Sequence, residues 1–392
     1  MAVMLSGMAA FAQSLSEGYY RVQNMGSGRY MYIKDCTGQV STLGAEMGSM
    51  EMWHGADSAM CDPGSVMYLD PQNDGYWDIT SQATSVSEII DRYMSIYDMG
   101  TYCYVYYGGQ YLYEDGTSEI TPDKGYVVAA NASEMSGKTK YRQWLTKRID
   151  SSSDNYFGFK PSVNAGGRYY APFYADFAYT PLCNQKTWYV SKVDKEYGVA
   201  VVEQISGSVA KSQPVFVECV SENMSDNKIE LLHKGGNSAK GNVLKGLYFD
   251  DLSRTNYTEY VKTRKNPAAI LFDSSTMRVL GTDENGKLAF VSSSPNIVQS
   301  WMIENRKLVW KDCLPHNTCY LQVDSDCPVS LTVMTEDEYE EYKKHTGIDA
   351  VAGGTSADAS VIYDLNGRRY SACEATQLPH GIYIQGNRRF VK

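Results

Sequence analysis

A short β-rich segment recurs at intervals of about forty residues in the first part of the chain. Residues 27–32, 64–69 and 108–113 read SGRYMY, GSVMYL and GGQYLY, so that Tyr30, Tyr68 and Tyr111 are separated by 38 and 43 residues. Glycine before a short apolar run is typical of a turn followed by a strand. One such unit cannot bury its apolar face alone, and the copies must pack together. The repeat therefore predicts a β fold built from repeated units.

Composition favours the same fold class. The 392 residues include 32 tyrosines, a residue type that suits half-buried strands and binding surfaces. The length allows two or three domains, each with its own core. We expect an all-β protein. The net charge of −10 opposes binding to phosphate backbones, and no basic stripe with interleaved aromatic residues occurs, so nucleic acid is excluded as a partner.

Residues 18–35, GYYRVQNMGSGRYMYIKD, resemble the opening of ricin-type β-trefoil domains. The resemblance extends over about residues 18–160 and implies a β-trefoil-like domain in which three lobes close one barrel. The family's Gln-x-Trp signature is not repeated lobe by lobe. Arg142-Gln143-Trp144 is only a near match, and Gln299-Ser300-Trp301 lies far downstream.

Residues 85–100 interrupt the strand pattern of this domain. Ser85 and Glu88 have the spacing of a capping box, which marks the start of a helix. We expect an inserted helix here, because the apolar residues lie on one face at helical spacing. These apolar positions are Val86, Ile89, Ile90, Tyr93, Met94 and Tyr97.

Residues 161–334 alternate short apolar strands with turns rich in Gly, Asn and Asp, which predicts a β-sandwich domain. Residues 168–177, 209–217 and 314–321 resemble a β-rich module of Bacteroidales secreted proteins. The function of that family gives no guide to the function of this chain. The expected strands include residues 188–191, 199–202, 214–217, 228–232, 289–291 and 319–323.

Residues 335–359 are predicted to form an acidic helix and a linker. Thr335 and Glu338 form a capping-box pattern, and Glu340 and Lys344 have the spacing of a helical ion pair. The following segment, residues 347–359, is rich in Gly, Ser and Ala and is typical of a linker.

The last segment, residues 360–392, predicts a small module of two β-hairpins. Asn366-Gly367 and Gly386-Asn387 interrupt alternating apolar runs and tolerate the backbone of tight turns. The motifs YDLNGRR and LPHGIYI resemble the C-terminal sorting domains of type IX secretion cargo in Bacteroidetes. That resemblance implies export, with the secretion machinery as a partner. The alternative is a final pair of strands that completes an ordinary β domain.

The N-terminal residues also indicate export. Residues 1–12, MAVMLSGMAAFA, are apolar and end in small residues, as a signal peptide does, although a basic n-region is missing. The alternative is a buried first strand. No other segment reaches the length of a membrane helix. We therefore expect a secreted or surface-attached protein without a transmembrane segment in the mature chain.

The sequence indicates no catalytic site, metal site or cofactor. Motifs of the common hydrolases, zincins and nucleotide-binding proteins are absent. Cys319 with His316 could form a nucleophile pair, but a small buried thiol is the stronger interpretation. Residues 70–75, DPQNDG, resemble a calcium loop but lack a carboxylate at the twelfth position, Ser81, which favours a surface turn.

The nine cysteines are scattered and show neither zinc-site spacing nor a full disulfide framework. Export permits some disulfides, and the local candidate joins Cys313 to Cys319 or Cys327. Buried free thiols are the favoured interpretation for most of the others.

Asp74, Tyr76, Trp77 and Asp78 combine aromatic rings with carboxylates beside a turn, and Trp53 adds a second tryptophan. An aromatic plane covers the apolar face of a sugar ring while a carboxylate holds its hydroxyls. These residues are the candidate carbohydrate-binding site. The alternative is that Trp53 and Trp77 pack in the core, where tryptophan is usually buried.

The sequence therefore favours a non-enzymatic, secreted or surface binding protein for carbohydrate or a host glycan. Fold resemblance alone is a weak guide to function. One alternative is a structural adhesin or surface spacer. The other is a hydrolase with an unrecognised site, which would require a deep polar cleft with at least two convergent titratable groups.

Overall fold

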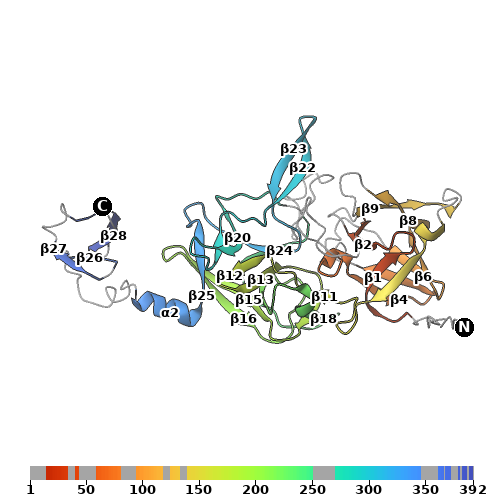
Figure 1. The fold of residues 1–392 in the computed structure, drawn as a ribbon, viewed down its shortest axis with the longest axis horizontal. Coiled ribbons are helices and arrows are strands. Elements are labelled where there is room, and N and C mark those ends of the chain that lie inside the picture. The colour runs from red at the N-terminus through yellow and green to blue at the C-terminus, as the bar shows by residue number, and fades with distance from the viewer. Residues whose placement is uncertain are drawn as a thin grey trace, which may run out of the picture.

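The computed structural model describes residues 15–33, 40–43, 59–80, 94–117, 124–132, 139–249, 270–345, 361–365, 367–371, 378–379, 382–385 and 388–391. The predicted signal peptide and linker, residues 1–12 and 347–359, lie outside them. The described part is predominantly β, as expected, with β1–β10 at one end and the C-terminal strands beyond α2 at the other (Figure 1). No helix among the described residues is long and apolar enough to cross a membrane.

The first ten strands form one antiparallel sheet that closes on itself. Six of them pair in the cyclic order β1, β4, β5, β6, β7 and β10, with β10 returning to β1. Closure leaves these six strands without a free edge and creates a barrel. The strands are β1 (Gly18–Asn24), β2 (Tyr30–Ile33), β3 (Val40–Leu43), β4 (Met67–Pro71), β5 (Tyr76–Thr80), β6 (Met94–Asp98), β7 (Cys103–Tyr107), β8 (Gln110–Thr117), β9 (Lys124–Ala130) and β10 (Trp144–Arg148).

Two parts of the barrel follow the same four-strand plan. In the first unit, β1 and β4 belong to the barrel and β2 and β3 form a hairpin; β7, β10, β8 and β9 repeat this plan. Between them, β5 and β6 supply two barrel strands, and residues 81–93 are outside the described residues. The assignment to the β-trefoil family stays a prediction.

The forty-residue sequence repeat matches the repeated strand units of the barrel only in part. Tyr30 and Tyr111 lie on β2 and β8, which have equivalent places in their units. Tyr68 lies on β4, the last strand of the first unit, so its segment is not a third copy of the same position.

The helix predicted for residues 85–100 is wrong over residues 94–98, which form β6 between β5 and β7. Met94 and Ile96 are buried while Tyr97 is exposed, which is the two-residue alternation of a strand. Strand pairing on both sides thus determined the structure of this segment more strongly than its apparent helical periodicity.

The central domain consists of two sheets over one core, which agrees with the predicted layering. Phe157, Tyr179 and Ile229 of the small sheet pack with Phe173 and Val190 of the large one. The small sheet contains β11 (Phe157–Gly158), β18 (Lys228–Leu232) and β14 (Ala178–Pro181). The large sheet contains β12 (Val163–Ala165), β13 (Arg168–Phe173), β15 (Lys186–Asp194), β16 (Val199–Ile205), β17 (Val215–Cys219), β19 (Leu244–Leu247), β20 (Met277–Thr282), β21 (Leu288–Val291), β24 (Thr318–Gln322) and β25 (Ser330–Thr335).

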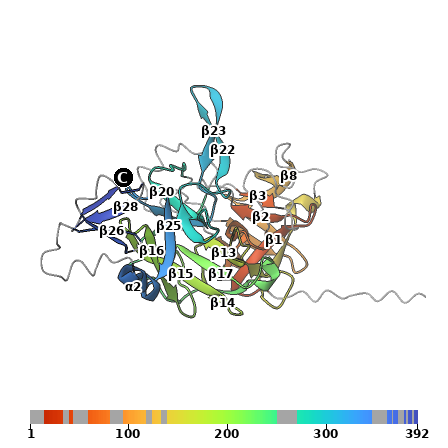
Figure 2. The ribbon, with the colours of Figure 1, turned by 60° about the vertical axis from the view of Figure 1, so that its left-hand side comes forward.

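A separate hairpin, β22 (Val298–Glu304) and β23 (Lys307–Cys313), projects from this domain in both ribbon views (Figures 1 and 2). Asn305 and Arg306 form its turn with φ of 51° and 63°. Two successive positive φ values match the twist that a two-residue hairpin turn requires.

The barrel and the central domain share buried residues. Tyr174, Tyr248 and Phe249 of the central domain belong to the hydrophobic cluster that fills the barrel. In the opposite direction, Val66 of the barrel domain joins the core of the central domain. Residues of one domain are therefore part of the other's core.

The acidic helix α2 (Glu336–His345) follows β25. Its predicted capping box is present, because the Thr335 amide donates to Glu338 Oε2 at 2.8 Å and the Glu338 amide donates to Thr335 Oγ1 at 3.4 Å. Lys343, rather than Lys344, lies 2.7 Å from Glu340. Buried Tyr339 anchors the helix against Val199 and Val201.

The C-terminal residues form the two predicted hairpins, β26 with β27 and β28 with β29. Antiparallel pairing of β26 with β28 joins the two hairpins into one sheet. The sheet has the order β27, β26, β28, β29 and pairs with no other sheet of the described structure. Ile362, Leu378 and Tyr383 form its small core. Its strands are β26 (Val361–Asp364), β27 (Arg369–Ser371), β28 (Ile382–Gln385) and β29 (Arg388–Val391).

The candidate disulfide between Cys313 and Cys319 or Cys327 is not formed, because both Cys319 and Cys327 are free thiols. Cys319 is fully buried and donates to the carbonyl of Val215 at 2.9 Å. Burial raises the pKa of this thiol to about 12, so that it is protonated at neutral pH. Cys319 thus matches the buried-thiol interpretation rather than a nucleophile paired with His316.

Candidate functional site

The outer face of strands β5 to β8 carries a cluster of tyrosines, and strand register explains how it forms. Side chains alternate across a strand, so Tyr76 and Asp78 point outward while Trp77 and Ile79 point into the barrel. Tyr76 is opposite Tyr97, and Tyr97 is opposite Tyr104. One residue row further along, Asp78 is opposite Ser95, Ser95 opposite Tyr106, and Tyr106 opposite Tyr111.

Two adjacent rows of outward side chains thus run across β5, β6 and β7, and the second row continues onto β8. We call this surface the tyrosine face and define it by Tyr76, Tyr97, Tyr102, Tyr104, Tyr106 and Tyr111.

The rings of the tyrosine face contact one another in a chain. The centroids of Tyr97 and Tyr76 are 5.4 Å apart, and those of Tyr76 and Tyr106 are 6.3 Å apart. Tyr106 continues to Tyr111 at 4.7 Å, and Tyr111 to Tyr104 at 5.1 Å. Edge and tilted contacts at these separations stabilise aromatic pairs. The rings therefore support one another in a fixed arrangement, which reduces the entropy lost on binding a ligand.

The face is accessible at one end and bordered by a cation at the other. Tyr76 is 36% exposed and Tyr97 is 41% exposed. The guanidinium of Arg142 lies 5.7 Å from the Tyr104 ring centroid and 5.5 Å from that of Tyr111. Such cation–π contacts hold the rings in place.

Carboxylates adjoin the accessible end. Asp78 is paired across the strands with Asp70, and Asp74 lies in the turn between β4 and β5. Burial, followed by the charges of Asp70 and Asp74, raises the pKa of Asp78 above its usual range. Asp74 accepts a hydrogen bond from the Tyr76 amide at 3.0 Å. The acidic residues thus form one edge of the tyrosine face.

The tyrosine hydroxyls supply additional polar groups. Burial and the hydroxyl of Tyr111 raise the pKa of Tyr106, while the Tyr104 hydroxyl, 3.5 Å away, raises that of Tyr102. Both phenols are therefore neutral at physiological pH and can donate as well as accept hydrogen bonds. Together the face presents aromatic planes, hydroxyls and carboxylates.

The five residues predicted as a sugar site separate in the structure. Tyr76, Asp74 and Asp78 lie on or beside the tyrosine face. Trp77 packs against the barrel core instead, as the alternative interpretation proposed. Trp53 lies outside the described residues.

The remaining tyrosines of the face were not selected from sequence. The alternation of Tyr102, Tyr104 and Tyr106 was a usable signal, because every second residue of a strand shares one face. Tyr97 falls within the segment predicted to be a helix, so the sequence pattern does not place it on the same strand face as the other tyrosines.

The calcium-loop resemblance at residues 70–75 corresponds to a tight turn between β4 and β5, where the Gln72 amide donates to the Tyr76 carbonyl at 2.8 Å and Gly75 has φ of 86°. Within the described ranges, no group of His, Cys, Asp and Glu has the arrangement of a metal site. The surface-turn interpretation describes this segment.

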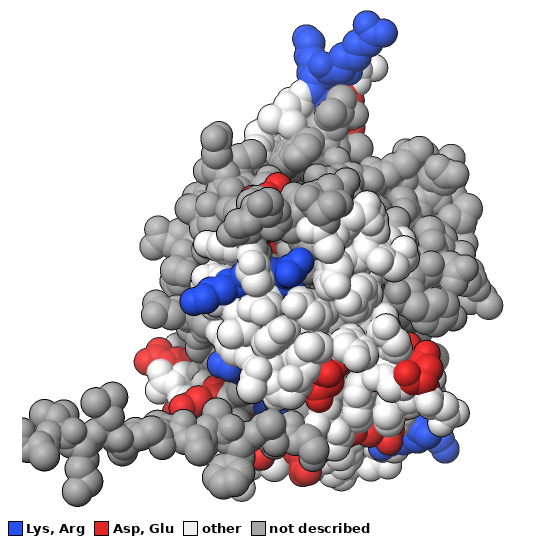
Figure 3. Space-filling view, turned by 90° about the vertical axis from the view of Figure 1, so that its right-hand side faces the viewer, with Lys and Arg blue, Asp and Glu red and all other residues white. Residues whose placement is uncertain are grey.

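The barrel end of the molecule shows a broad area of uncharged side chains, with basic side chains near the middle of the view and at the lower right, and acidic residues along the lower part (Figure 3). Basic side chains mark the tip of the projecting β22–β23 hairpin at the top, where Arg306 and Lys307 are exposed.

Comparisons with known proteins identify no family. No family model matches the chain, and no curated protein matches it. A designed threefold symmetric protein, ThreeFoil, is similar at 13% identity over 34% of this chain and 99% of its own, with a TM-score of 0.24. Cry35Ab1 is similar at 11% identity over 54% of this chain and 70% of its own, with a TM-score of 0.23.

A mosquitocidal holotoxin is similar at 8% identity over 78% of this chain and 34% of its own, with a TM-score of 0.24. Scores at this level indicate neither a family nor a function for the chain.

Proposed function

We propose that this protein is a non-enzymatic carbohydrate-binding protein and that the tyrosine face is its binding surface. The observation that carries the proposal is the continuous contact of Tyr97, Tyr76, Tyr106 and Tyr111 beside the carboxylates of Asp70 and Asp78. Sugar rings have apolar C–H faces that pack on aromatic planes and hydroxyls that donate to carboxylates. The surface offers both in adjacent rows.

The charge of the site narrows the ligand class. Burial first, and then the charges of Asp70 and Asp74, raise the pKa of Asp78, so three carboxylates lie near one another at this edge. An anionic sugar would be repelled by this edge, since like charges in close contact are unfavourable. The ligand of this proposal is therefore a neutral glycan, long enough to cover two or more tyrosine rings.

The experiment is a glycan array with the purified protein, followed by titration of the best neutral glycan. The double variant Tyr76→Ala/Tyr97→Ala removes two accessible rings of the face. With roughly 0.5–1.5 kcal/mol for each aromatic contact, we expect affinity to fall about tenfold or more.

Tyr363→Ala is the matched control, because Tyr363 is 40% exposed but lies in the C-terminal module. It should bind like the unmodified protein. Two results contradict the proposal: an array without signal, or equal affinity for the double variant and the control. Cell binding that is independent of sugar would instead favour the adhesin alternative.

We further propose that the C-terminal module serves export or surface attachment. Its four-stranded sheet is separate from the other sheets of the described structure, and its turns carry the motifs that resemble sorting domains. A secretion machine that recognises a folded tail needs such a separable unit. The apolar segment at residues 1–12 supports the same localisation.

Deletion of residues 361–392 tests this role in the cells that produce the protein. We expect surface display, measured with antibody on intact cells, to be lost while circular dichroism of the truncated chain keeps its β signal. Unchanged display would refute the sorting role. Loss of the β signal would indicate that these strands complete the preceding domain.

A further inference from the structure

A second potential site lies between the barrel domain and the central domain. It is a cavity of about 780 Å³. Its walls come from the loop at residues 61–63 in the barrel domain, from residues 159–162 and β13, and from residues 315–318 before and within β24. Ligand pockets of proteins commonly have volumes of 300–1,000 Å³ and often occur where domains meet. The cavity is separate from the tyrosine face, which shares none of its lining residues.

Most of the lining is apolar, and it includes two aromatic residues and several prolines. Phe173 and Trp310 supply aromatic rings, and the rings of Pro161, Pro295 and Pro315 add compact apolar C–H surfaces. Trp310 is 43% exposed, although tryptophan is usually buried. Aromatic rings and the C–H groups of proline rings both pack well against a planar aromatic ligand.

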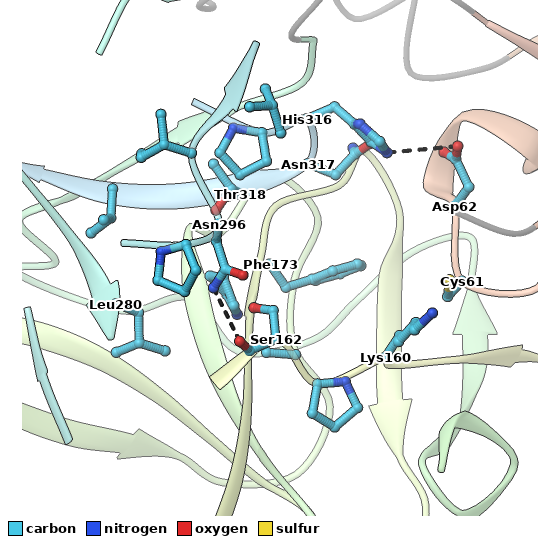
Figure 4. Close-up of a pocket in the computed structure, with 18 of the residues that line it drawn as sticks. Cys61, Asp62, Lys160, Ser162, Phe173, Leu280, Asn296, His316, Asn317 and Thr318 are labelled. Carbon is cyan, nitrogen blue, oxygen red and sulfur yellow. Dashed lines mark hydrogen bonds and ion pairs between the residues drawn. The ribbon is translucent and has the colours of Figure 1, made fainter. Parts of the chain in front are cut away.

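The acidic group of the cavity is already engaged. Asp62 is only 3% exposed, and its Oδ1 accepts the Gly64 amide at 2.7 Å. Its Oδ2 lies 3.7 Å from Nε2 of His316 across the domain boundary. Figure 4 shows this contact between the two domains. The carboxylate therefore has partners within the protein and is not the group that selects a ligand.

Lys160 is the remaining charged residue of the lining. It is half-buried, it follows the buried Phe159, and no hydrogen bond or ion pair joins it to another residue in the described part of the chain. Figure 4 places Lys160 toward the end of the cavity that contains Asp62 and His316, with Leu280 toward the opposite end. A half-buried ammonium beside apolar walls favours an anionic group that replaces its lost hydration.

We propose that this cavity binds a small aromatic carboxylate. Its ring system packs between Phe173, Trp310 and the proline rings, and its carboxylate accepts hydrogen bonds from the Lys160 ammonium. The proposal is independent of the carbohydrate site and concerns a second, chemically different ligand.

Isothermal titration with 1-naphthoate, and with neutral 1-naphthamide for comparison, tests this assignment. We expect naphthoate to bind and naphthamide to bind at least about tenfold more weakly, since a charge-assisted contact is worth roughly 1.5–3 kcal/mol. Lys160→Gln should weaken naphthoate by a similar factor and leave naphthamide unchanged, whereas Lys160→Arg should retain naphthoate binding.

Two further variants separate the cavity from other surfaces. Ser162→Trp fills the cavity from an exposed lining position and should abolish binding of both compounds, while Lys287→Gln removes an exposed lysine elsewhere and should change neither. No binding of naphthoate overturns the proposal. Equal affinities for the two compounds, or full binding by Lys160→Gln or Ser162→Trp, overturn it as well.

Discussion

Replacing Trp144 with alanine should destabilise the protein by about 3–5 kcal/mol, the usual cost of removing a large aromatic side chain from a core. Trp144 is fully buried within the barrel cluster. Its indole N–H donates to the Leu112 carbonyl at 2.9 Å, and its strand pairs with both β1 and β7. The substitution would thus leave a cavity and an unpaired carbonyl where the barrel closes.

Urea unfolding followed by circular dichroism measures this effect. Trp310→Ala removes a 43% exposed tryptophan and should shift stability by no more than about 0.5 kcal/mol, as expected for surface substitutions. Trp144→Phe keeps most of the volume and should lie between the two. If Trp144→Ala unfolds at the same urea concentration as Trp310→Ala, the barrel does not depend on this residue.

Local signals in the sequence were sufficient for much of the fold. The predicted strand at residues 228–232 coincides with β18, because its alternation is bounded by turn residues. The capping box at Thr335 and both C-terminal hairpins also formed where short-range patterns placed them. In each case the residues that determine the element lie within a few positions of one another.

Residues 94–98 show where such reasoning fails. Met94 and Tyr97 fit a helical face, but Met94 and Ile96 fit the inner face of a strand equally well. Pairing with β5 and β7 decides between the two, and this pairing brings together segments that the helical pattern does not relate. The hydrophobic periodicity of a short segment contains no information about its pairing with distant strands.

The candidate sites depend even more on long-range register. Tyr106 and Tyr111 become neighbours through the turn at Gly108 and Gly109, which both have positive φ, and this pairing is local. Tyr76 reaches Tyr97 only through the pairing of β5 with β6. The cavity between the domains brings together residues 62, 160 and 316, a combination that no sequence pattern indicates.

Arg21 should contribute as much to stability as Trp144, because its buried side chain donates hydrogen bonds to both domains. The side chain is completely buried, and burial lowers its pKa to about 10, so it stays charged at neutral pH. Its Nε donates to the Ala59 carbonyl at 2.7 Å and to Ser65 Oγ at 3.0 Å in the barrel domain. Its Nη1 donates to Asn155 Oδ1 at 2.9 Å and to the Tyr156 carbonyl at 2.7 Å, directly before β11.

These contacts join the two chain segments that continue into the cavity lining, residues 61–63 and 159–162. Arg21→Met would leave several buried acceptors unpaired, at roughly 1–3 kcal/mol each, so we expect a total loss of about 3–5 kcal/mol. Arg21→Lys should recover only part of it, because an ammonium cannot reproduce the planar fork of the guanidinium.

Limited proteolysis distinguishes a joint between domains from a general loss of stability. Arg278→Met is the control, since Arg278 is also buried, at 2% exposed, and donates several hydrogen bonds, but to carbonyls within the central domain. We expect Arg21→Met to become sensitive to cleavage between residues 149 and 157 and to lose naphthoate binding, whereas Arg278→Met should be destabilised without cleavage at that position. Identical cleavage patterns for the two variants would show that Arg21 stabilises the fold without holding the cavity walls together.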